Sequence, residues 1–263
     1  MLFPCDSRAE GVAKQVFFRD QPCLYFVTPE LRESLDSWIV LVEEAIQGGV
    51  DLVQLRLKKS SLATIAAVGY ALQKRLKKLQ IPLIINDHIQ IARLLHADGV
   101  HLGQSDGKVE EARRWLGPTA IIGLSIGTKQ EAEAAEKEPL SYIAASPVFH
   151  SKSKPGCERS WGLDGLQELV RLTHHPVVAI GGIDEGNIRE VVDSGVAAIA
   201  IISAIAEADV PKKAVEQLVN KMKREEGSPS VEWLGTRPFN SNRAFRQLLL
   251  VRQAKQFAES VES

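Results

Sequence analysis

The sequence predicts the α/β fold class, with the chain forming a single (β/α)8 barrel, and three observations lead to this prediction. The chain has 263 residues, which is enough for one barrel domain. Short and almost continuously apolar segments alternate with longer segments of helical periodicity, as parallel strands buried on both faces do. Polar or glycine-rich residues follow most of the apolar segments, and barrels of this kind build their sites at the carboxyl ends of the strands.

Eight apolar segments are the expected strands. They are rich in β-branched residues and have the length of strands rather than of helices. In chain order they are Cys23–Thr28, Asp51–Arg56, Pro82–Asp87, Gly99–Gly103, Ala120–Ile126, Tyr142–Val148, Pro176–Gly181 and Ala197–Ser203.

Segments with helical spacing separate the expected strands. Examples with one charged and one apolar face are Ser34–Gln47, Leu62–Leu79 and Gln130–Lys137. Strands that alternate with helices imply parallel pairing through right-handed crossovers. A doubly wound open sheet has the same alternation, but eight units within about 200 residues favour a small closed barrel.

The barrel is expected to span residues 23–225. Residues 1–22 form a short N-terminal extension, and residues 226–263 form a C-terminal helical tail. The tail begins with a linker rich in Gly, Ser and Pro (Glu226–Ser230) and continues as an expected helix from Ser241 to about Ser260, with an apolar stripe that is expected to dock on the barrel. A partner or subunit interface on this helix is left open, and so is a homo-oligomer.

Composition excludes several classes of function. The formal net charge is −1, so nothing global attracts nucleic acid or an anionic membrane. No apolar run approaches the roughly 20 residues of a membrane span, and the N-terminus lacks the apolar core of a secretory signal. The three cysteines have no paired spacing, which favours a reducing compartment. We therefore expect a cytoplasmic protein with small-molecule ligands.

A first candidate site follows the second expected strand, where Gln54, Arg56 and Lys58 alternate with apolar residues. Residues two apart on a strand share a face, so the three side chains are expected to point together. Polar groups on the inner face of a barrel strand need a partner. An anion and heterocycle site is one interpretation, and an internal ion pair with a carboxylate is the alternative.

Two carboxylates, Asp87 and Asp106, follow neighbouring expected strands, and Asn86 precedes the first of them. Magnesium is typically held by one or two carboxylates together with substrate phosphates. Each Asp also precedes a helical segment, so N-capping is the alternative.

Two further clusters fit phosphate groups. Ser151 and Ser153 alternate with Lys152 and Lys154 after the sixth expected strand, which suits a phosphate or pyrophosphate. A solvated basic loop is the alternative there. Gly181-Gly182 and Ser203 follow the seventh and eighth strands, the common phosphate site of such barrels, although the glycines could serve packing alone.

The histidines carry weaker signals. His101 lies inside an apolar strand and is expected to be a hydrogen-bonded core residue rather than a ligand. His174 and His175 precede the seventh strand, at the opposite end of the barrel from the clusters above, and are expected to be structural.

Together these segments resemble the thiamine-phosphate synthase family. The resemblance rests on Val53-Gln-Leu-Arg-Leu-Lys, Ile85-Asn-Asp, Ala97-Asp-Gly-Val-His-Leu-Gly-Gln-Ser-Asp, Pro147-Val-Phe-His-Ser-Lys-Ser-Lys and Ile180-Gly-Gly-Ile, in family order across about 200 residues. It implies a TIM barrel and a magnesium-dependent transferase. The family joins hydroxymethylpyrimidine pyrophosphate to thiazole phosphate and releases thiamine monophosphate and pyrophosphate.

The resemblance also implies a role for each matching residue. Ser125, Arg56 and Lys154 would be the catalytic residues, and Asp87 and Asp106 the Mg²⁺ ligands. The substrates would be bound by Gln54, Arg56, Lys58, Asn86, Ser125 and Lys154 on the pyrimidine pyrophosphate side, and by Ser151, Ser153, Gly182, Ile202 and Ser203 on the thiazole phosphate side.

The chain departs from the family pattern in one loop. The family loop usually begins with Gly-Pro and carries two threonines, whereas here it begins with Ser146 and carries Ser151 and Ser153. Two other functions are alternatives. A related thiazole tautomerase would need a catalytic histidine near Gly127, where there is no side chain, and a phosphate-binding barrel without catalysis would not need the Asp87/Asp106 pair.

Overall fold

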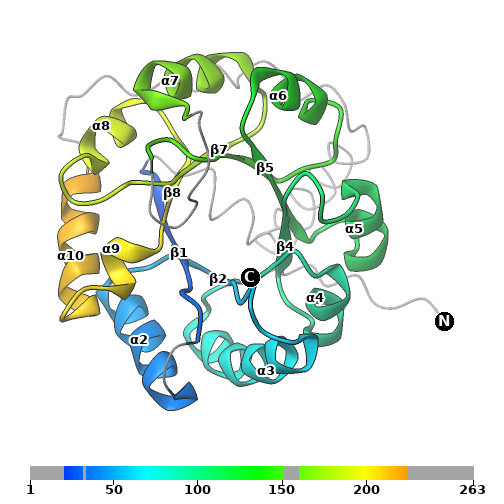
Figure 1. Cartoon of the computed structure of the whole chain (residues 1–263), viewed down its shortest axis with the longest axis vertical. Coiled ribbons are helices and arrows are strands. Elements are labelled where there is room, and N and C mark those ends of the chain that lie inside the picture. Colours follow the sequence, from blue (N-terminus) through cyan, green and yellow to red (C-terminus); the bar gives the residue numbers. More distant parts are fainter. Residues whose placement is uncertain (1–20, 32–33, 151–159, 224–263) are drawn as a thin grey trace, which may run out of the picture. The chain divides into compact units, whose positions relative to one another are not determined.

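The protein is described by a computed structural model covering residues 21–31, 34–150 and 160–223. Eight parallel strands close into one barrel, in which β8 pairs with β1 (Figure 1). This closure confirms the predicted barrel and excludes the open doubly wound sheet. The strands are β1 (Cys23–Val27), β2 (Leu52–Leu55), β3 (Leu83–Asn86), β4 (Gly99–Leu102), β5 (Ile121–Ile126), β6 (Tyr142–Ala145), β7 (Val177–Ile180) and β8 (Ala198–Ile201).

Helices surround the barrel, as Figure 1 shows. Ser34, Ser61 and Thr128 each start a helix by accepting the backbone N–H three residues further on, which satisfies one of the unpaired donors of the first turn. The helices are α2 (Leu35–Gly48), α3 (Leu62–Leu79), α4 (Ile89–Leu95), α5 (Val109–Leu116), α6 (Lys129–Ala135), α7 (Gly162–Leu172), α8 (Ile188–Asp193), α9 (Ser203–Ala206) and α10 (Pro211–Met222).

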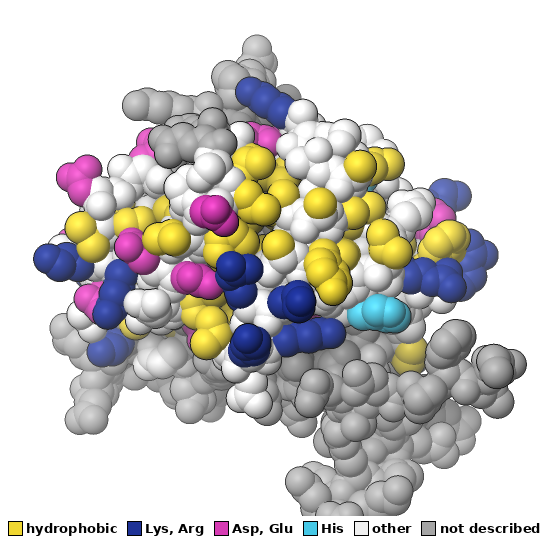
Figure 2. Space-filling model, turned by 90° about the horizontal axis from the view of Figure 1, so that it is seen from below, with side chains coloured by type: hydrophobic (Ala, Val, Ile, Leu, Met, Phe, Trp, Pro, Cys, Tyr) yellow, Lys and Arg dark blue, Asp and Glu magenta, His cyan; other side chains and the backbone are white. Residues whose placement is uncertain are grey.

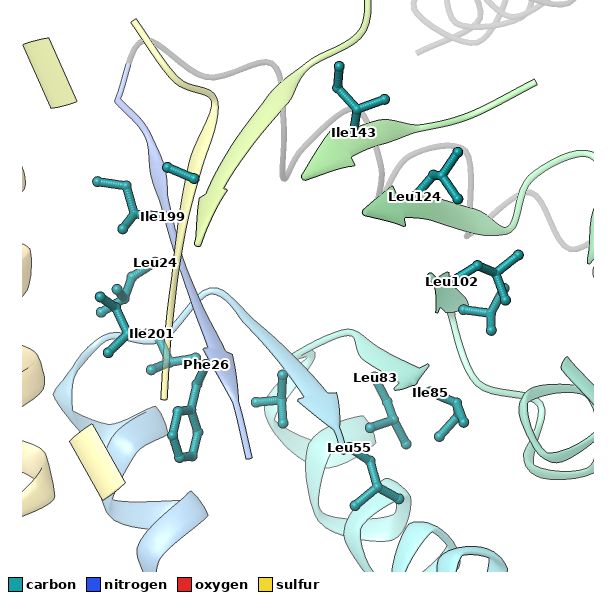
Figure 3. Close-up of a cluster of buried hydrophobic side chains, with 14 of the residues drawn as sticks. Leu24, Phe26, Leu55, Leu83, Ile85, Leu102, Leu124, Ile143, Ile199 and Ile201 are labelled. Carbon is teal, nitrogen blue, oxygen red and sulfur yellow. The ribbon is translucent and has the colours of Figure 1, made fainter. Parts of the chain in front are cut away.

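Each strand buries both of its faces, which explains the nearly continuous apolar segments. Leu24 and Phe26 on β1 belong to the main core cluster, which also contains helix residues such as Leu72 of α3. Figure 3 shows strand side chains of this cluster. The alternate positions, Tyr25 and Val27, belong to a second cluster inside the barrel. Burying such an apolar side chain stabilises the fold by about 1.5–3 kcal/mol, so both faces stabilise the barrel.

The barrel interior holds two large aromatic side chains beside small residues. Tyr142 is fully buried, and its ring lies against Gly123 of the neighbouring strand. A Cβ atom at Gly123 would lie 2.0 Å from Cζ of Tyr142, so only glycine leaves room for this ring. Ala144, Ala198 and Ala200 in the same inner cluster also take little space.

The expected strands were one to three residues too long at several ends. β6 stops at Ala145 rather than Val148 because Pro147 has no backbone N–H for the ladder. Nearly all of the predicted extension (1–22) and the tail (226–263) lie outside the described residues, so both boundaries stay predictions.

The surface carries both signs of charge. On the face in Figure 2, Lys and Arg side chains gather beside Asp, Glu and hydrophobic side chains. Within the described ranges, none of the helices has both the length and the apolar composition of a transmembrane segment.

Candidate active site

One cavity of about 320 Å³ lies where the carboxyl ends of the strands meet. This volume is in the range of small-molecule sites. All ten predicted site residues that the structure describes line this cavity: Gln54, Arg56, Lys58, Asn86, Asp87, Asp106, Ser125, Gly182, Ile202 and Ser203. Residues that are far apart in the sequence therefore line the same end of the barrel. Their positions after the carboxyl ends of the parallel strands predicted this arrangement.

The backbone after β2 is held by residues that follow β1. Of the three predicted polar residues on this segment, only Gln54 lies inside the strand. The backbone N–H of Arg56 donates to Oγ1 of Thr28 at 3.0 Å, and that of Lys58 donates to Oε1 of Glu30 at 2.8 Å. These bonds hold the segment in place after the regular ladder has ended, and the three predicted side chains all reach the cavity.

The two cations on this segment have different partners. Nζ of Lys58 lies 3.1 Å from Oδ2 of Asp87, so an internal ion pair is present at this position. The guanidinium of Arg56 has no ion-pair partner among the described residues. A cation that lines a cavity without a carboxylate partner is available to an anionic ligand.

Asp87 and Asp106 do not cap helices. The N-cap residues of α4 and α5 are His88 and Lys108, so the capping alternative is wrong for both carboxylates. Asp87 has a φ of +65°, in the left-handed region, and its N–H donates to the carbonyl of His101 at 2.8 Å. The backbone at the end of β3 is thus fixed in an uncommon conformation that leaves the carboxyl group at the cavity.

The two carboxyl groups share a hydrogen bond, and their pKa values move apart. Burial raises the pKa of Asp87, and the neighbouring Asp106 raises it further against the opposing effect of Lys58. Burial also acts to raise the pKa of Asp106, but hydrogen bonds from Asp87 and from the backbone N–H of Gly103 lower it below its usual value. The two carboxyl groups therefore compete for one proton, and Asp87 takes it up more readily than Asp106 does.

Asn86 and Ser125 supply uncharged polar groups. Asn86 is buried, with 8% of its surface exposed, and its carboxamide has no hydrogen-bond partner among the described residues. Buried amides are normally paired, so this one is available to a ligand. Oγ of Ser125 lies 2.8 Å from Nε2 of His101, and the Ser125 carbonyl accepts from Nε2 of Gln104 at 2.7 Å.

The ends of β7 and β8 bring backbone close to the cavity. Gly182 has a φ of +65°, and its carbonyl accepts from Nδ2 of Asn187 at 2.9 Å. A Cβ atom at Gly182 would lie 2.7 Å from Cβ of Phe149, so this position requires glycine for both conformation and space. Ser203 begins the short helix α9, directly after Ile202.

Three predicted site residues lie outside the described residues. These are Ser151, Ser153 and Lys154, and their predicted phosphate-binding role is not tested by the structure.

Two tyrosines at the cavity were not predicted from the sequence, and a histidine there was predicted only as a core residue. Tyr25 and Tyr142 line the cavity, and neither was singled out. His101 is buried and hydrogen-bonded, as expected of a core residue, but it also lines the cavity. Alternation was the available signal: Leu24 and Phe26 pack outward, so Tyr25 between them must face inward.

Comparisons with known proteins identify the family. The sequence profile described as "Thiamine monophosphate synthase" matches residues 24–205. A thiamine-phosphate synthase from Vibrio campbellii is 40% identical over 200 residues, covering 76% of this chain and 98% of the relative. One from Chlamydia abortus is 39% identical over 201 residues, covering 75% and 95%.

A solved structure agrees with the sequence matches. The thiamine phosphate pyrophosphorylase from Pyrococcus furiosus is 34% identical, superposes with a TM-score of 0.69, and the match covers 78% of this chain and 97% of that one. The profile covers more than half of the chain, and the relatives are covered over nearly their whole length. The chain therefore belongs to the thiamine monophosphate synthase family.

Proposed function

We propose that the chain is a thiamine-phosphate synthase that joins hydroxymethylpyrimidine pyrophosphate to thiazole phosphate. The observation that carries the proposal is the composition of the cavity. It combines a cation that has no ion-pair partner among the described residues (Arg56), a carboxyl pair (Asp87 and Asp106) and uncharged hydrogen-bonding groups such as Asn86. A polyanion with a neutral heterocycle needs this combination of groups.

The residues divide into three groups by the chemistry of their side chains. The pyrophosphate would be bound by Arg56 and Lys58, together with Lys154, and the pyrimidine ring by Gln54, Asn86 and Ser125. The thiazole phosphate would lie against Gly182, Ile202 and Ser203, which line the cavity, together with Ser151 and Ser153.

Asp87 and Asp106 fit a magnesium ion. Each carboxyl group affects the pKa of the other, and a divalent cation would supply a counter-charge that favours the ionised form of both. The described residues contain no group of three or more His, Cys, Asp or Glu side chains suited to a metal. Oxygen atoms of the pyrophosphate would then complete the coordination, as is usual for Mg²⁺. When bound, the ion would stabilise the negative charge of the leaving group.

The reaction needs charge stabilisation and positioning rather than a protein nucleophile. The bond between the pyrimidine methylene carbon and the pyrophosphate oxygen breaks, and its electron pair leaves with the pyrophosphate. The thiazole nitrogen then gives its lone pair to the same carbon, which forms the new C–N bond. Arg56 and Lys58 stabilise the leaving charge, and the two ends of the cavity hold the reactants in line.

The tautomerase alternative lacks its essential group. Gly127 lines the cavity and has no side chain to transfer a proton. The neighbouring Glu131 carboxylate accepts the N–H of Gly127 at 2.6 Å through Oε2. The histidine that the tautomerase reaction requires is therefore missing from this position.

The test is pyrophosphate release by the purified protein given both phosphorylated substrates. We expect release with Mg²⁺, no release with excess EDTA, and recovery when Mg²⁺ is restored. Thiamine monophosphate should form in a one-to-one ratio with pyrophosphate. A folded protein that releases none under these conditions would contradict the proposal, and release that EDTA does not change would contradict the metal assignment alone.

The division of the site has its own test. Lys154→Ala should weaken binding of the pyrimidine pyrophosphate far more than binding of thiazole phosphate. Equal losses for the two ligands would contradict the assignment of Lys154 to the pyrophosphate side.

A further inference from the structure

A continuous row of hydrogen-bonded side chains crosses the interior of the barrel beneath the cavity. Nε2 of Gln54 donates to the hydroxyl of Tyr25 at 2.7 Å, which lies 3.1 Å from the hydroxyl of Tyr142. That hydroxyl lies 2.8 Å from Nδ1 of His101, whose Nε2 lies 2.8 Å from Oγ of Ser125. The row therefore begins and ends on residues assigned to the pyrimidine ring, and its three middle members have no assigned role.

The middle of the row is shielded from water. Tyr25 and Tyr142 are exposed by 1% and 0%. Their rings meet edge to face, and the ring of His101 stacks on that of Tyr142 with 5.6 Å between centroids. Burial raises the pKa of both tyrosines far above the usual value, so both hydroxyls keep their protons at any physiological pH.

Because each hydroxyl has one proton, the direction of one hydrogen bond determines the next. Tyr25 accepts from Gln54, so its own proton goes to Tyr142. The proton of Tyr142 then goes to Nδ1 of His101, which leaves the imidazole proton on Nε2. This Nε2–H donates to Ser125, whose hydroxyl proton remains for the cavity.

The row can also run in the opposite direction. If the Gln54 amide turns over, its Oε1 accepts from Tyr25. Each hydroxyl then turns its own proton toward the residue before it in the row, and the imidazole of His101 takes its other neutral tautomer, with the proton on Nδ1. Ser125 then donates to His101 and offers the cavity a lone pair, while Gln54 offers its NH₂ group. In either arrangement one end of the row presents a donor and the other an acceptor, so the two ends cannot change independently.

We propose that this row sets the donor and acceptor pattern that the cavity offers to the heterocycle, and that Tyr142 is a positioning residue that couples Gln54 to Ser125. The inference rests on the proposed function, because an aminopyrimidine presents an amino donor next to a ring-nitrogen acceptor. A row with one donor end and one acceptor end is complementary to such an edge. It rejects rings with two donors or two acceptors, since one buried group would then be left unpaired.

A double-mutant cycle tests the coupling. The dissociation constant of the pyrimidine pyrophosphate is measured with Mg²⁺ and without thiazole phosphate for the unmodified protein, Gln54→Leu, Ser125→Ala and the double variant. We expect the two effects to depart from simple multiplication by about threefold or more, as residues within one hydrogen-bond network do. The cycle is repeated with Tyr142→Phe, which removes the central hydroxyl and keeps the ring, and the departure should disappear.

Tyr70→Phe is the matched control. Tyr70 lies on α3, is 59% exposed and is outside the cavity, so the same chemical change there should leave the coupling intact. Thermal melts establish that each variant is folded. If Tyr142→Phe prevents folding, Tyr25→Phe takes its place, because it breaks the row one bond away.

The outcomes separate the two proposals. The inference is overturned if Gln54 and Ser125 remain coupled in Tyr142→Phe, or if they are not coupled in the unmodified protein. Neither result would affect the proposed function. A folded, unmodified protein that does not bind the pyrimidine pyrophosphate would overturn the proposed function and this inference with it.

Discussion

Nζ of Lys58 lies 3.1 Å from Oδ2 of Asp87, and this contact joins the segment after β2 to the end of β3. The lysine side chain is 45% exposed and the aspartate side chain 15%, so the pair faces the open cavity. At such exposure the pair itself contributes little to folding stability. Lys58 is proposed to bind the pyrophosphate, and Asp87 is proposed to bind the Mg²⁺ ion. The contact therefore places the proposed ligands of the two parts of a magnesium pyrophosphate next to each other.

Asp87→Asn should reduce turnover without unfolding the protein. The change removes a charge proposed to bind Mg²⁺ and keeps the size of the side chain. We expect kcat/KM to fall by about 100-fold or more, which is the scale for loss of a metal or transition-state contact. Asp193→Asn is the control, since Asp193 pairs with Arg189 on the surface of α8. Activity close to that of the control would exclude a metal role for Asp87.

Arg56→Ala should separate activity from stability. The guanidinium has no ion-pair partner among the described residues, so its removal breaks no such pair there. We expect kcat/KM to fall by about 100-fold while Tm stays within a degree or rises. Arg75→Ala is the counterpart: it breaks a surface pair with Glu43 and should leave kinetics unchanged. A large loss of Tm with Arg56→Ala would show that the residue is structural.

Gly182→Ala should cost more stability than Gly162→Ala. The two glycines have φ values of +65° and +60°, so an alanine is strained by a similar amount at each, about 1–2 kcal/mol. Only at Gly182 would the new Cβ atom also meet other atoms, 2.7 Å from Cβ of Phe149. Urea unfolding of both variants measures the difference, and thiazole phosphate binding should weaken only for Gly182→Ala. Equal free energies of unfolding would mean that the Phe149 segment moves aside without cost.

Stability should fall as the pH falls, because of a cluster at the end of the barrel opposite the cavity. Burial acts to raise the pKa of Glu136, but hydrogen bonds from Thr173 and His174 lower it below 4.5. Burial lowers the pKa of His175 below 6.5, and its Nε2 lies 3.0 Å from the carbonyl of Ala135. These contacts agree with the structural role that was expected for the two histidines.

The sign of the effect follows from these two shifts. Both groups bind protons less readily in the folded state than in the unfolded state. Their contribution is therefore complete above the unfolded pKa values and is lost as the pH falls through the folded ones. Urea unfolding from about pH 7 to pH 4 should show decreasing stability, and Glu136→Gln should flatten the acidic part of the curve. Glu43→Gln, a matched change on the surface, should leave the acidic part of the curve unchanged. If the two variants give the same dependence of stability on pH, Glu136 is not the cause of the effect.

The barrel, and the end of it at which the cavity lies, follow from local sequence patterns. Each strand is a local apolar segment, and the polar residue that follows it, such as Asp87 after β3, is adjacent in the chain. Because parallel strands point the same way, all such residues reach the same mouth. Together with the family resemblance, this pattern predicted ten described residues that all line one cavity, and their roles stay predictions. The family resemblance assigned roles that composition and spacing left open.

How these residues pair with one another depends on the tertiary structure. Asp87 and Asp106 could have capped helices, and their mutual hydrogen bond depends on how far β3 and β4 extend. The hydrogen bond between Tyr25 and Tyr142 joins residues 117 positions apart and exists only because Gly123 leaves room for the second ring. The alternation of residues along a strand predicts which face of the sheet each side chain occupies, because this orientation is a local property. Distances across a barrel depend on closure and packing, which no local pattern contains.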